Sequence, residues 1–310
     1  MSSKLRSASE FAFLGAASGF GQSRSGVELA PDYFREHLFF NLDHVCDLGD
    51  VVSDGRIIDR EAHSSNDQKA WNVAMKVFER ASEAMSIGSR LVTIGGDHSV
   101  AIGSVAASLL HYPDIKVVWI DAHGDINTPL TSPSGHLHGM PLAALLGLFE
   151  HSFGGTPLKP ENLFIVGVRD LDPFESKFVE QLKIKNVTAS DVRRRPLQSL
   201  RKLKSWLGDN KTPVHLSFDV DALDPMVAPA TGLGVADGLS AAEAQVIVRC
   251  VVRASCVRTI DIVEFNSVVT TPQQAELTLQ NLALIFSEIQ PRLINEKWLG
   301  LLDRTNEIAI

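Results

Sequence analysis

Apolar runs of strand length alternate along this chain with segments of helical length. The runs lie near 11–16, 45–52, 90–95, 115–121, 162–168, 186–190, 213–220 and 257–263. The segments of helical length include 66–88, 99–111, 139–149, 174–183, 197–208, 240–254 and 272–290. Such alternation predicts a mostly parallel sheet with helices on both faces. Runs such as Val117–Ile120 are apolar at every position, which is typical of strands buried on both sides.

The chain has the organisation expected of a single domain. Its 310 residues contain no internal repeat, low-complexity tract or long linker. Two polar loops, 122–138 and 221–238, are rich in Gly, Pro, Ser and Thr, and each follows a predicted strand. Loops in that position commonly carry binding and catalytic residues, so they indicate an active site rather than a domain joint. We therefore predict one α/β domain over residues 1–310.

Charge and cysteine content exclude several classes of function. The formal net charge of −8 argues against nucleic-acid binding, which needs a clustered basic face. The basic run Arg193–Arg195 is expected to lie in a solvated loop. No apolar run approaches the roughly 18 residues needed to cross a bilayer, so no membrane association is expected. The cysteines Cys46, Cys250 and Cys256 form no CxxC pair and suit a reducing compartment, so we expect a cytoplasmic protein, with an organelle as the alternative.

Acidic and imidazole side chains follow three of the apolar runs. After Val117–Ile120 come Asp121, His123 and Asp125, at alternate positions that would point the same way on an extended segment. The other two runs lead into the sequences Gly95-Gly96-Asp97-His98 and Asp219-Val220-Asp221. Open α/β sheets bind ligands at the carboxyl ends of their strands, so these side chains are expected to converge there.

The converging residues have the chemistry of a metal centre. Four carboxylates at one edge repel each other unless cations compensate them, and two divalent ions would cancel four charges. Mixed carboxylate and imidazole ligands suit Mn²⁺, Fe²⁺, Co²⁺ or Zn²⁺ better than Ca²⁺, and the absence of Cys argues against structural zinc. The expected ligands are His98, Asp121, His123, Asp125, Asp219 and Asp221.

Each of these short patterns also has a simpler interpretation. A single Asp-x-Asp at a strand end is more often a turn or helix cap, and a single His after Gly-Gly-Asp is more often a hydrogen-bonded core or loop residue. The metal interpretation depends on all three patterns occurring together. We expect Asp97 to support the ligands, Asp224 to shape a turn, and His215 to be a hydrogen-bonded histidine of the core.

Five motifs resemble those of the ureohydrolase family, and most closely those of arginases. They are Gly95-Gly96-Asp97-His98-Ser99, Asp121-Ala122-His123-Gly124-Asp125-Ile126-Asn127, Ser134-Gly135-His136-Leu137-His138-Gly139-Met140-Pro141, Ser217-Phe218-Asp219-Val220-Asp221-Ala222-Leu223-Asp224-Pro225 and Asp261-Ile262-Val263-Glu264-Phe265-Asn266. The resemblance runs from Phe11 to about residue 290, in order. It implies a single-domain three-layer αβα sandwich with an eight-stranded, mostly parallel sheet, two Mn²⁺ per subunit, and a trimer or hexamer.

The same resemblance assigns the ligands to two metals. It implies that one metal is held by His98, Asp121, Asp125 and Asp219, and the other by Asp121, His123, Asp219 and Asp221. It implies hydrolysis of L-arginine to L-ornithine and urea by a hydroxide shared between the metals. Glu264 would match the guanidinium, because a carboxylate fits that group in charge and shape. Asp125 would protonate the leaving amine and His138 would exchange protons with solvent.

Recognition of the amino-acid end of the substrate is implied for a further group of residues. Asn127 and Ser134 match residues that bind the α-carboxylate, and Asp172 and Glu175 match residues that face the α-ammonium. Asp172 could equally cap a helix beginning at Pro173. Buried polar groups discriminate strongly against analogues that leave them unpaired, so L-arginine is favoured over agmatine.

Three positions depart from the arginase pattern. His136, beside Ser134, stands where arginases commonly have Asn and would also contact the substrate, and Leu233 stands where they commonly have Thr. These two departures keep open an agmatinase or another hydrolase of guanidino compounds. Ala242 replaces an Arg that joins subunits in some arginases, which makes the oligomer less certain. A metal-loaded oligomer without catalytic activity is the third interpretation, and the complete ligand set weighs against it.

Overall fold

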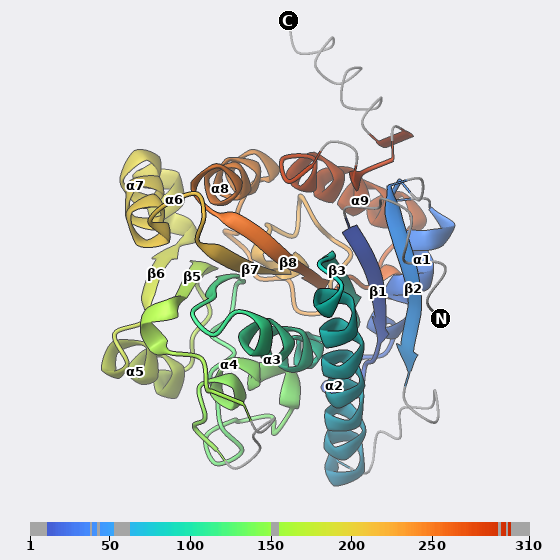
Figure 1. The fold of residues 1–310 in the computed structure, drawn as a ribbon, viewed down its shortest axis with the longest axis horizontal. Coiled ribbons are helices and arrows are strands. Elements are labelled where there is room, and N and C mark those ends of the chain that lie inside the picture. The colour runs from blue at the N-terminus through green and yellow to red at the C-terminus, as the bar shows by residue number, and fades with distance from the viewer. Residues whose placement is uncertain are drawn as a thin grey trace, which may run out of the picture.

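Eight parallel strands form one sheet in the computed structural model, which describes residues 11–37, 39–41, 44–52, 63–149, 155–290, 293–295 and 297–298 (Figure 1). The strands are β1 (Phe11–Ala17), β2 (Val45–Val52), β3 (Arg90–Gly95), β4 (Lys116–Ile120), β5 (Leu163–Val168), β6 (Lys185–Thr188), β7 (Pro213–Asp219) and β8 (Cys256–Val263). Their order across the sheet is β2-β1-β3-β8-β7-β4-β5-β6, and every adjacent pair is parallel. The predicted αβα fold class is confirmed.

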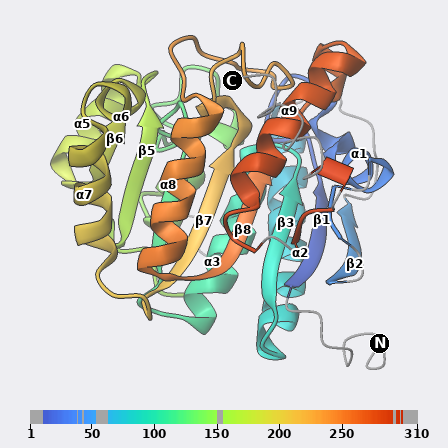
Figure 2. The ribbon, with the colours of Figure 1, turned by 90° about the horizontal axis from the view of Figure 1, so that it is seen from above.

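Helices cover both faces of the sheet (Figure 2). One core layer includes residues of α1 (Ala30–Glu36), α6 (Ala189–Arg194), α7 (Pro196–Leu207), α8 (Ala241–Ala254) and α9 (Pro272–Phe286). The opposite layer includes residues of α2 (His63–Ser86), α3 (Ala101–His111), α4 (Pro141–Leu145) and α5 (Pro173–Gln181). Alternate residues of β4 enter the two layers, because Val118 and Ile120 pack into the first and Val117 and Trp119 into the second.

The strands that end in acidic or imidazole residues lie next to one another at the centre of the sheet. In the order β3-β8-β7-β4, they carry residues from distant parts of the sequence to one edge. The Gly95-Gly96 pair allows a close approach there, since a Cβ on Gly96 would lie 1.6 Å from the Ser18 carbonyl oxygen. The Gly96 carbonyl in turn accepts a hydrogen bond from the Glu264 N–H at 2.9 Å. The ends of β3 and β8 are thereby joined.

The local predictions were wrong at several places. No helix was predicted at Ala30–Glu36, where α1 forms, and the predicted strand 186–190 ends at Thr188. Thr188 caps α6 in a reciprocal pair with Asp191, so Arg193 and Arg194 occupy the last helical turn rather than a loop, although both are exposed. The predicted helix 139–149 is confined to α4, and Gly147 follows with φ of 71°.

Within the described ranges, every helix is too short or too polar to span a lipid bilayer.

Candidate metal centre and substrate cavity

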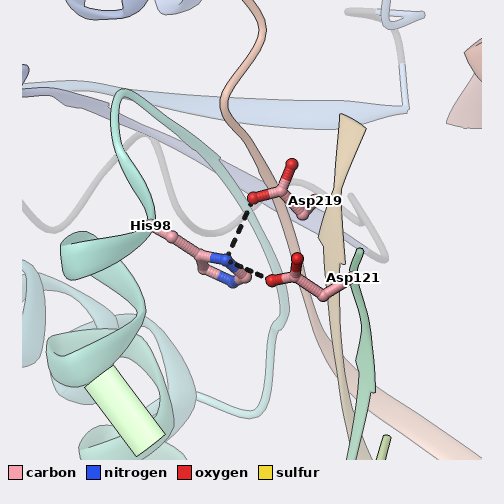
Figure 3. Close-up of side chains that lie close together, drawn as sticks. All are labelled: His98, Asp121 and Asp219. Carbon is pink, nitrogen blue, oxygen red and sulfur yellow. Dashed lines mark ion pairs between the residues drawn. The ribbon is translucent and has the colours of Figure 1, made fainter. Parts of the chain in front are cut away.

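Three carboxylates surround one imidazole nitrogen at the carboxyl edge of the sheet, and Figure 3 shows two of them, Asp121 and Asp219, beside His98. The His98 Nδ1 atom lies 3.0 Å from Asp121 Oδ2, 3.0 Å from Asp125 Oδ2 and 3.1 Å from Asp219 Oδ2. All four side chains are buried. His98, Asp121 and Asp219 form a group whose ligand atoms are close enough to hold one cation.

Two buried polar atoms of this group have no hydrogen-bond partner. Among the described residues, His98 Nδ1 and Asp125 Oδ2 are buried atoms with no hydrogen bond of acceptable geometry. Burial, together with the charges of neighbouring carboxylates, raises the pKa of Asp219 well above its usual value and that of Asp125 to about 7. A bound cation would satisfy the orphaned atoms and offset this repulsion, so the donor set fits a metal.

A second group shares Asp121 with the first. The His123 Nδ1 atom lies 3.4 Å from Asp121 Oδ1 and 3.1 Å from Asp221 Oδ2, and these three residues form another set able to hold a cation. Nearby Asp221 and Asp121 raise the pKa of His123 despite the opposing effect of burial. The sequence-predicted ligands are therefore brought together as two adjoining groups.

A local turn, rather than an extended strand, orients the side chains of Asp121, His123 and Asp125. The strand β4 ends at Ile120, so the predicted alternation of Asp121, His123 and Asp125 along an extended segment is wrong. The Asp121 Oδ1 atom accepts a hydrogen bond from the His123 N–H at 2.7 Å, which turns the chain at once. Asp125 then adopts φ of 50°, a strained left-handed conformation for a residue other than Gly. Convergence is achieved by this turn.

The same turn recurs at the other two segments. Asp219 Oδ1 accepts from the Asp221 N–H at 2.7 Å, and Asp97 Oδ1 accepts from the Ser99 N–H at 2.9 Å. Asp97 also accepts from the Gly21 N–H at 2.9 Å, so it supports the loop of His98 as predicted. Asp224 shapes its own turn as expected, accepting from the main-chain N–H groups of Met226 and Gly238.

Two residues that the sequence analysis did not single out hold the His98 ring. The ring stacks on the Trp119 indole, with centroids 4.1 Å apart and an interplanar angle of 6°. Its Nε2 atom lies 2.9 Å from Ser217 Oγ, which leaves Nδ1 facing the carboxylates. Trp119 and Ser217 each precede an expected ligand by two positions, so strand alternation was a usable signal for both.

A cavity of about 240 Å³ opens above the two groups. Its lining includes most of the sequence-predicted site residues, namely His98, His123, Asp125, Asn127, Ser134, His138, Asp172, Glu175, Asp219, Asp221 and Glu264. Leu233 also lines it. His136 is not among the lining residues; its N–H donates to Ser134 Oγ at 3.2 Å, and its ring centroid lies 5.9 Å from that of His138.

Glu264 is oriented from three directions at the end of β8. It accepts hydrogen bonds from Gln22 Nε2 at 2.7 Å and from the His98 N–H at 3.0 Å, and its Oε1 lies 3.2 Å from His138 Nδ1. Burial opposes ionisation of Glu264, but the bonds from His138, His98 and Gln22 lower its pKa overall. Its φ of 63° shows that the backbone is strained to aim this carboxylate. Gln22 was not among the predicted site residues, and the structure gives it this orienting contact.

The other end of the cavity is built around the start of α5. Asp172 caps that helix, accepting from the N–H groups of Phe174 and Glu175, and its Oδ2 accepts from Asn127 Nδ2 at 2.7 Å. The capping interpretation of Asp172 is thus confirmed, and the same residue also lines the cavity. Burial raises the pKa of Glu175 to about 7, against the main-chain hydrogen bonds from Asp172 and Ile126.

His215 lies away from this centre, as expected. Its Nε2 atom lies 2.8 Å from Asp261 Oδ2 and its Nδ1 atom 2.9 Å from Ser108 Oγ, all within the core. The prediction of a hydrogen-bonded core histidine is confirmed.

Comparisons with known proteins agree with this geometry. The model of the family described as "Arginase family" matches residues 9–287. A hepatic arginase from Aquarana catesbeiana is 36% identical over 283 residues, covering 86% of this chain and 88% of that protein. The structure of an arginase from Bacillus caldovelox superposes with a TM-score of 0.80 at 32% identity, covering 90% of this chain and 98% of the other. An Entamoeba histolytica arginase solved in complex with L-ornithine gives a TM-score of 0.77 at 25% identity, covering 90% and 98%.

Proposed function

Because this chain belongs to the arginase family, we propose that it hydrolyses L-arginine to L-ornithine and urea, using two Mn²⁺ ions per subunit. The observation that carries this proposal is the adjoining pair of ligand groups that share Asp121 and whose other members line one cavity.

The metals would be held by the six carboxylate and imidazole residues. His98, Asp121, Asp125 and Asp219 would hold one ion, and Asp121, His123, Asp219 and Asp221 the other. Oxygen-rich sets with one imidazole each suit Mn²⁺. Two such ions would, when bound, supply hydroxide at neutral pH by lowering the pKa of water in the site.

The chain's own residues would then orient the substrate and move protons. Glu264, ionised and fixed by Gln22 and the His98 N–H, offers its carboxylate to the planar guanidinium. Asp125, whose carboxylate lines the cavity, would pass a proton to the leaving amine. His138, on the cavity wall beside Glu264, would exchange protons between the site and solvent.

The substrate's α-amino and α-carboxylate groups would bind near α5. Asp172 and Glu175 would face the ammonium, and Asn127 and Ser134 would bind the carboxylate, with His136 acting through its N–H on Ser134 Oγ. The Entamoeba histolytica arginase binds L-ornithine in its solved complex, which supports an amino-acid ligand for this cavity as well.

One observation supports a second substrate class. Leu233 lines the cavity and is 37% exposed, so it presents an apolar surface where a hydroxyl would give a polar contact. That surface supports agmatine, which lacks the α-carboxylate, or another guanidino compound as an alternative substrate.

Urea release from L-arginine and from agmatine, measured after loading with Mn²⁺, Co²⁺ or Zn²⁺ separately, tests the proposal. A higher kcat/KM for L-arginine with Mn²⁺ supports it, whereas preference for agmatine would replace it by the second class. Asp121→Asn should abolish urea release without loss of the circular-dichroism spectrum of the fold. Full activity in that variant would contradict the metal assignment.

Assembly and location complete the proposal. We propose a homo-oligomer, a trimer or hexamer, that acts in cytoplasmic arginine metabolism such as the urea cycle. The free thiols of Cys46, Cys250 and Cys256 support a reducing compartment. Light scattering of the purified protein and fractionation of the source cells would test these two points.

A further inference from the structure

The guanidinium of Arg169 is bound by main-chain carbonyl groups. Arg169 follows β5, and its nitrogen atoms donate to six carbonyl oxygens at 2.7–3.4 Å. The acceptors belong to Gly167, Asp221, Ala222, Leu223, Val235 and Ala236. Within the described part of the chain, no carboxylate forms an ion pair with this side chain, and the cavity lining does not include it. A guanidinium whose side-chain hydrogen bonds all go to main-chain carbonyls indicates that Arg169 holds these loops together.

The loops that Arg169 holds carry one ligand group. The guanidinium donates to the Asp221 carbonyl at 2.8 Å and to those of the next two residues. The main-chain N–H groups of Arg169 and Asp170 donate to the Ala122 carbonyl at 2.9 and 3.0 Å. Ala122 lies between Asp121 and His123. Arg169 therefore contacts the backbone on both sides of the group formed by Asp121, His123 and Asp221.

The other ligand group is supported by different residues. His98 is fixed by the Trp119 ring and by Ser217 Oγ, and neither belongs to the loops that Arg169 contacts. The two groups share Asp121 but are supported by different neighbouring residues. A defect in one of these supports should therefore affect one metal more than the other.

We propose that Arg169 is a positioning residue that sets the affinity of the second metal, the one held through His123 and Asp221, by fixing the two ligand segments relative to each other. This inference rests on the proposed binuclear centre. It adds a residue outside the cavity that would decide how fully the centre is loaded.

Charge and positioning predict opposite effects of removing this guanidinium. Its positive charge lies near Asp221, Asp121, Asp224 and Asp219 and by itself opposes a bound cation, so neutralisation alone would tighten Mn²⁺ binding. Loss of the guanidinium hydrogen bonds alone would loosen the ligand segments and weaken Mn²⁺ binding. If positioning dominates, the neutral variant binds the second Mn²⁺ less tightly despite the more favourable charge.

The test is an Mn²⁺ titration of the full chain in which electron paramagnetic resonance measures free Mn²⁺. It compares wild type, Arg169→Met and Arg169→Lys. We expect Arg169→Met to weaken the second Mn²⁺ by about 10–100-fold and to leave the first within a few-fold of wild type. Arg169→Lys, which keeps the charge with fewer donors, should weaken the same step. If Arg169→Met does not fold, Arg169→Lys decides on the same criterion.

Two controls identify the site. Arg193 also donates to carbonyls of the 221–238 loop, at Asp237 and Gly238, but far along the chain from the ligands, so Arg193→Met should leave both Mn²⁺ steps unchanged. In a His123→Ala background, which removes the second site, Arg169→Met should not weaken the remaining ion further. Ser217→Ala should instead weaken the ion held through His98.

The outcomes separate this inference from the proposed function. Tighter or unchanged binding of the second Mn²⁺ in Arg169→Met, or equal weakening of both ions, overturns the role of Arg169 while two-site binding by wild type still supports the binuclear centre. Wild-type protein that binds fewer than two Mn²⁺ in the same titration contradicts the proposed function itself.

Discussion

The imidazole of His98 lies flat on the indole of Trp119, at a ring separation of 4.1 Å, and the same indole donates its Nε1–H to Asp121 Oδ2 at 3.1 Å. One buried side chain on β4 therefore sets both the plane of an imidazole ligand and the orientation of the carboxylate shared by the two groups. Trp119 is fully buried, so neither contact competes with solvent. The geometry of the proposed centre is fixed from beneath, within the hydrophobic core.

Trp119→Phe should keep an aromatic ring under His98 but remove the donor to Asp121. We expect Mn²⁺ affinity to fall by about 10-fold, because a hydrogen bond to a charged group contributes about 1.5–3 kcal/mol and reorganisation recovers part of it. Calorimetric Mn²⁺ titration measures this change. Trp206→Phe is the matched control, since the buried Trp206 also donates its Nε1–H, to the Glu161 carbonyl, away from the centre. Equal affinities in the two variants would contradict the role of the Trp119 donor.

His215→Ala should destabilise the protein by about 3–5 kcal/mol, because it leaves a cavity in the core and removes a partner from Asp261 and Ser108. Urea denaturation of the metal-free protein measures this loss. His111→Ala, at the half-exposed end of α3, should cost less than about 1 kcal/mol. A similar small cost for His215→Ala would show that the buried hydrogen bonds contribute little.

Binding of L-ornithine should strengthen as pH rises towards about 7. Burial raises the pKa of Glu175 to about 7, so below that pH the carboxyl is largely neutral and cannot pair with an ammonium. The dissociation constant should fall by up to about tenfold per pH unit below 7 and level off above it. Calorimetry between pH 5.5 and 8.5, at about half-unit steps, would detect this.

The same titration distinguishes Glu175 from other acids. Glu175→Gln should bind ornithine weakly with little dependence on pH, whereas Glu180→Gln, an exposed position on the same helix, should follow wild type. A pH dependence that survives in Glu175→Gln would assign the titration to another group.

Removal of metal should lower thermal stability. A ligand that binds only the folded state stabilises it by about 2.7 kcal/mol per site at 100 times its dissociation constant. For two such sites in a chain of this size, the sum corresponds to a rise in Tm of about 5–10 °C when Mn²⁺ is added to chelated protein. Ca²⁺, which prefers all-oxygen sites, should give a smaller rise at the same concentration. Equal shifts with both ions would argue against imidazole ligands.

Several features of this protein were readable from short stretches of sequence. The apolar runs predicted the strands because burial on both faces leaves no polar position, as in Val117–Ile120. The pairing of carboxylates with His98 and His123 predicted a metal chemistry because those side chains together are costly without cations. The local patterns failed where a cap competed with strand propensity, as at Thr188, whose side chain starts α6 instead.

Tertiary structure alone decided how these pieces meet. The order β3-β8-β7-β4 depends on pairing between strands more than a hundred residues apart, such as Leu91 with Thr259, and no local pattern encodes it. The left-handed turns at Asp125 and Glu264 are strained and persist only because surrounding contacts hold them. The hydrogen bonds of Arg169 form only when the chain around Ala122 and Asp221 is folded beside it. The sequence by itself determined the elements and the ligand types, because these follow from residue chemistry and periodicity. Their distances were decided by long-range packing, which is a property of the whole fold.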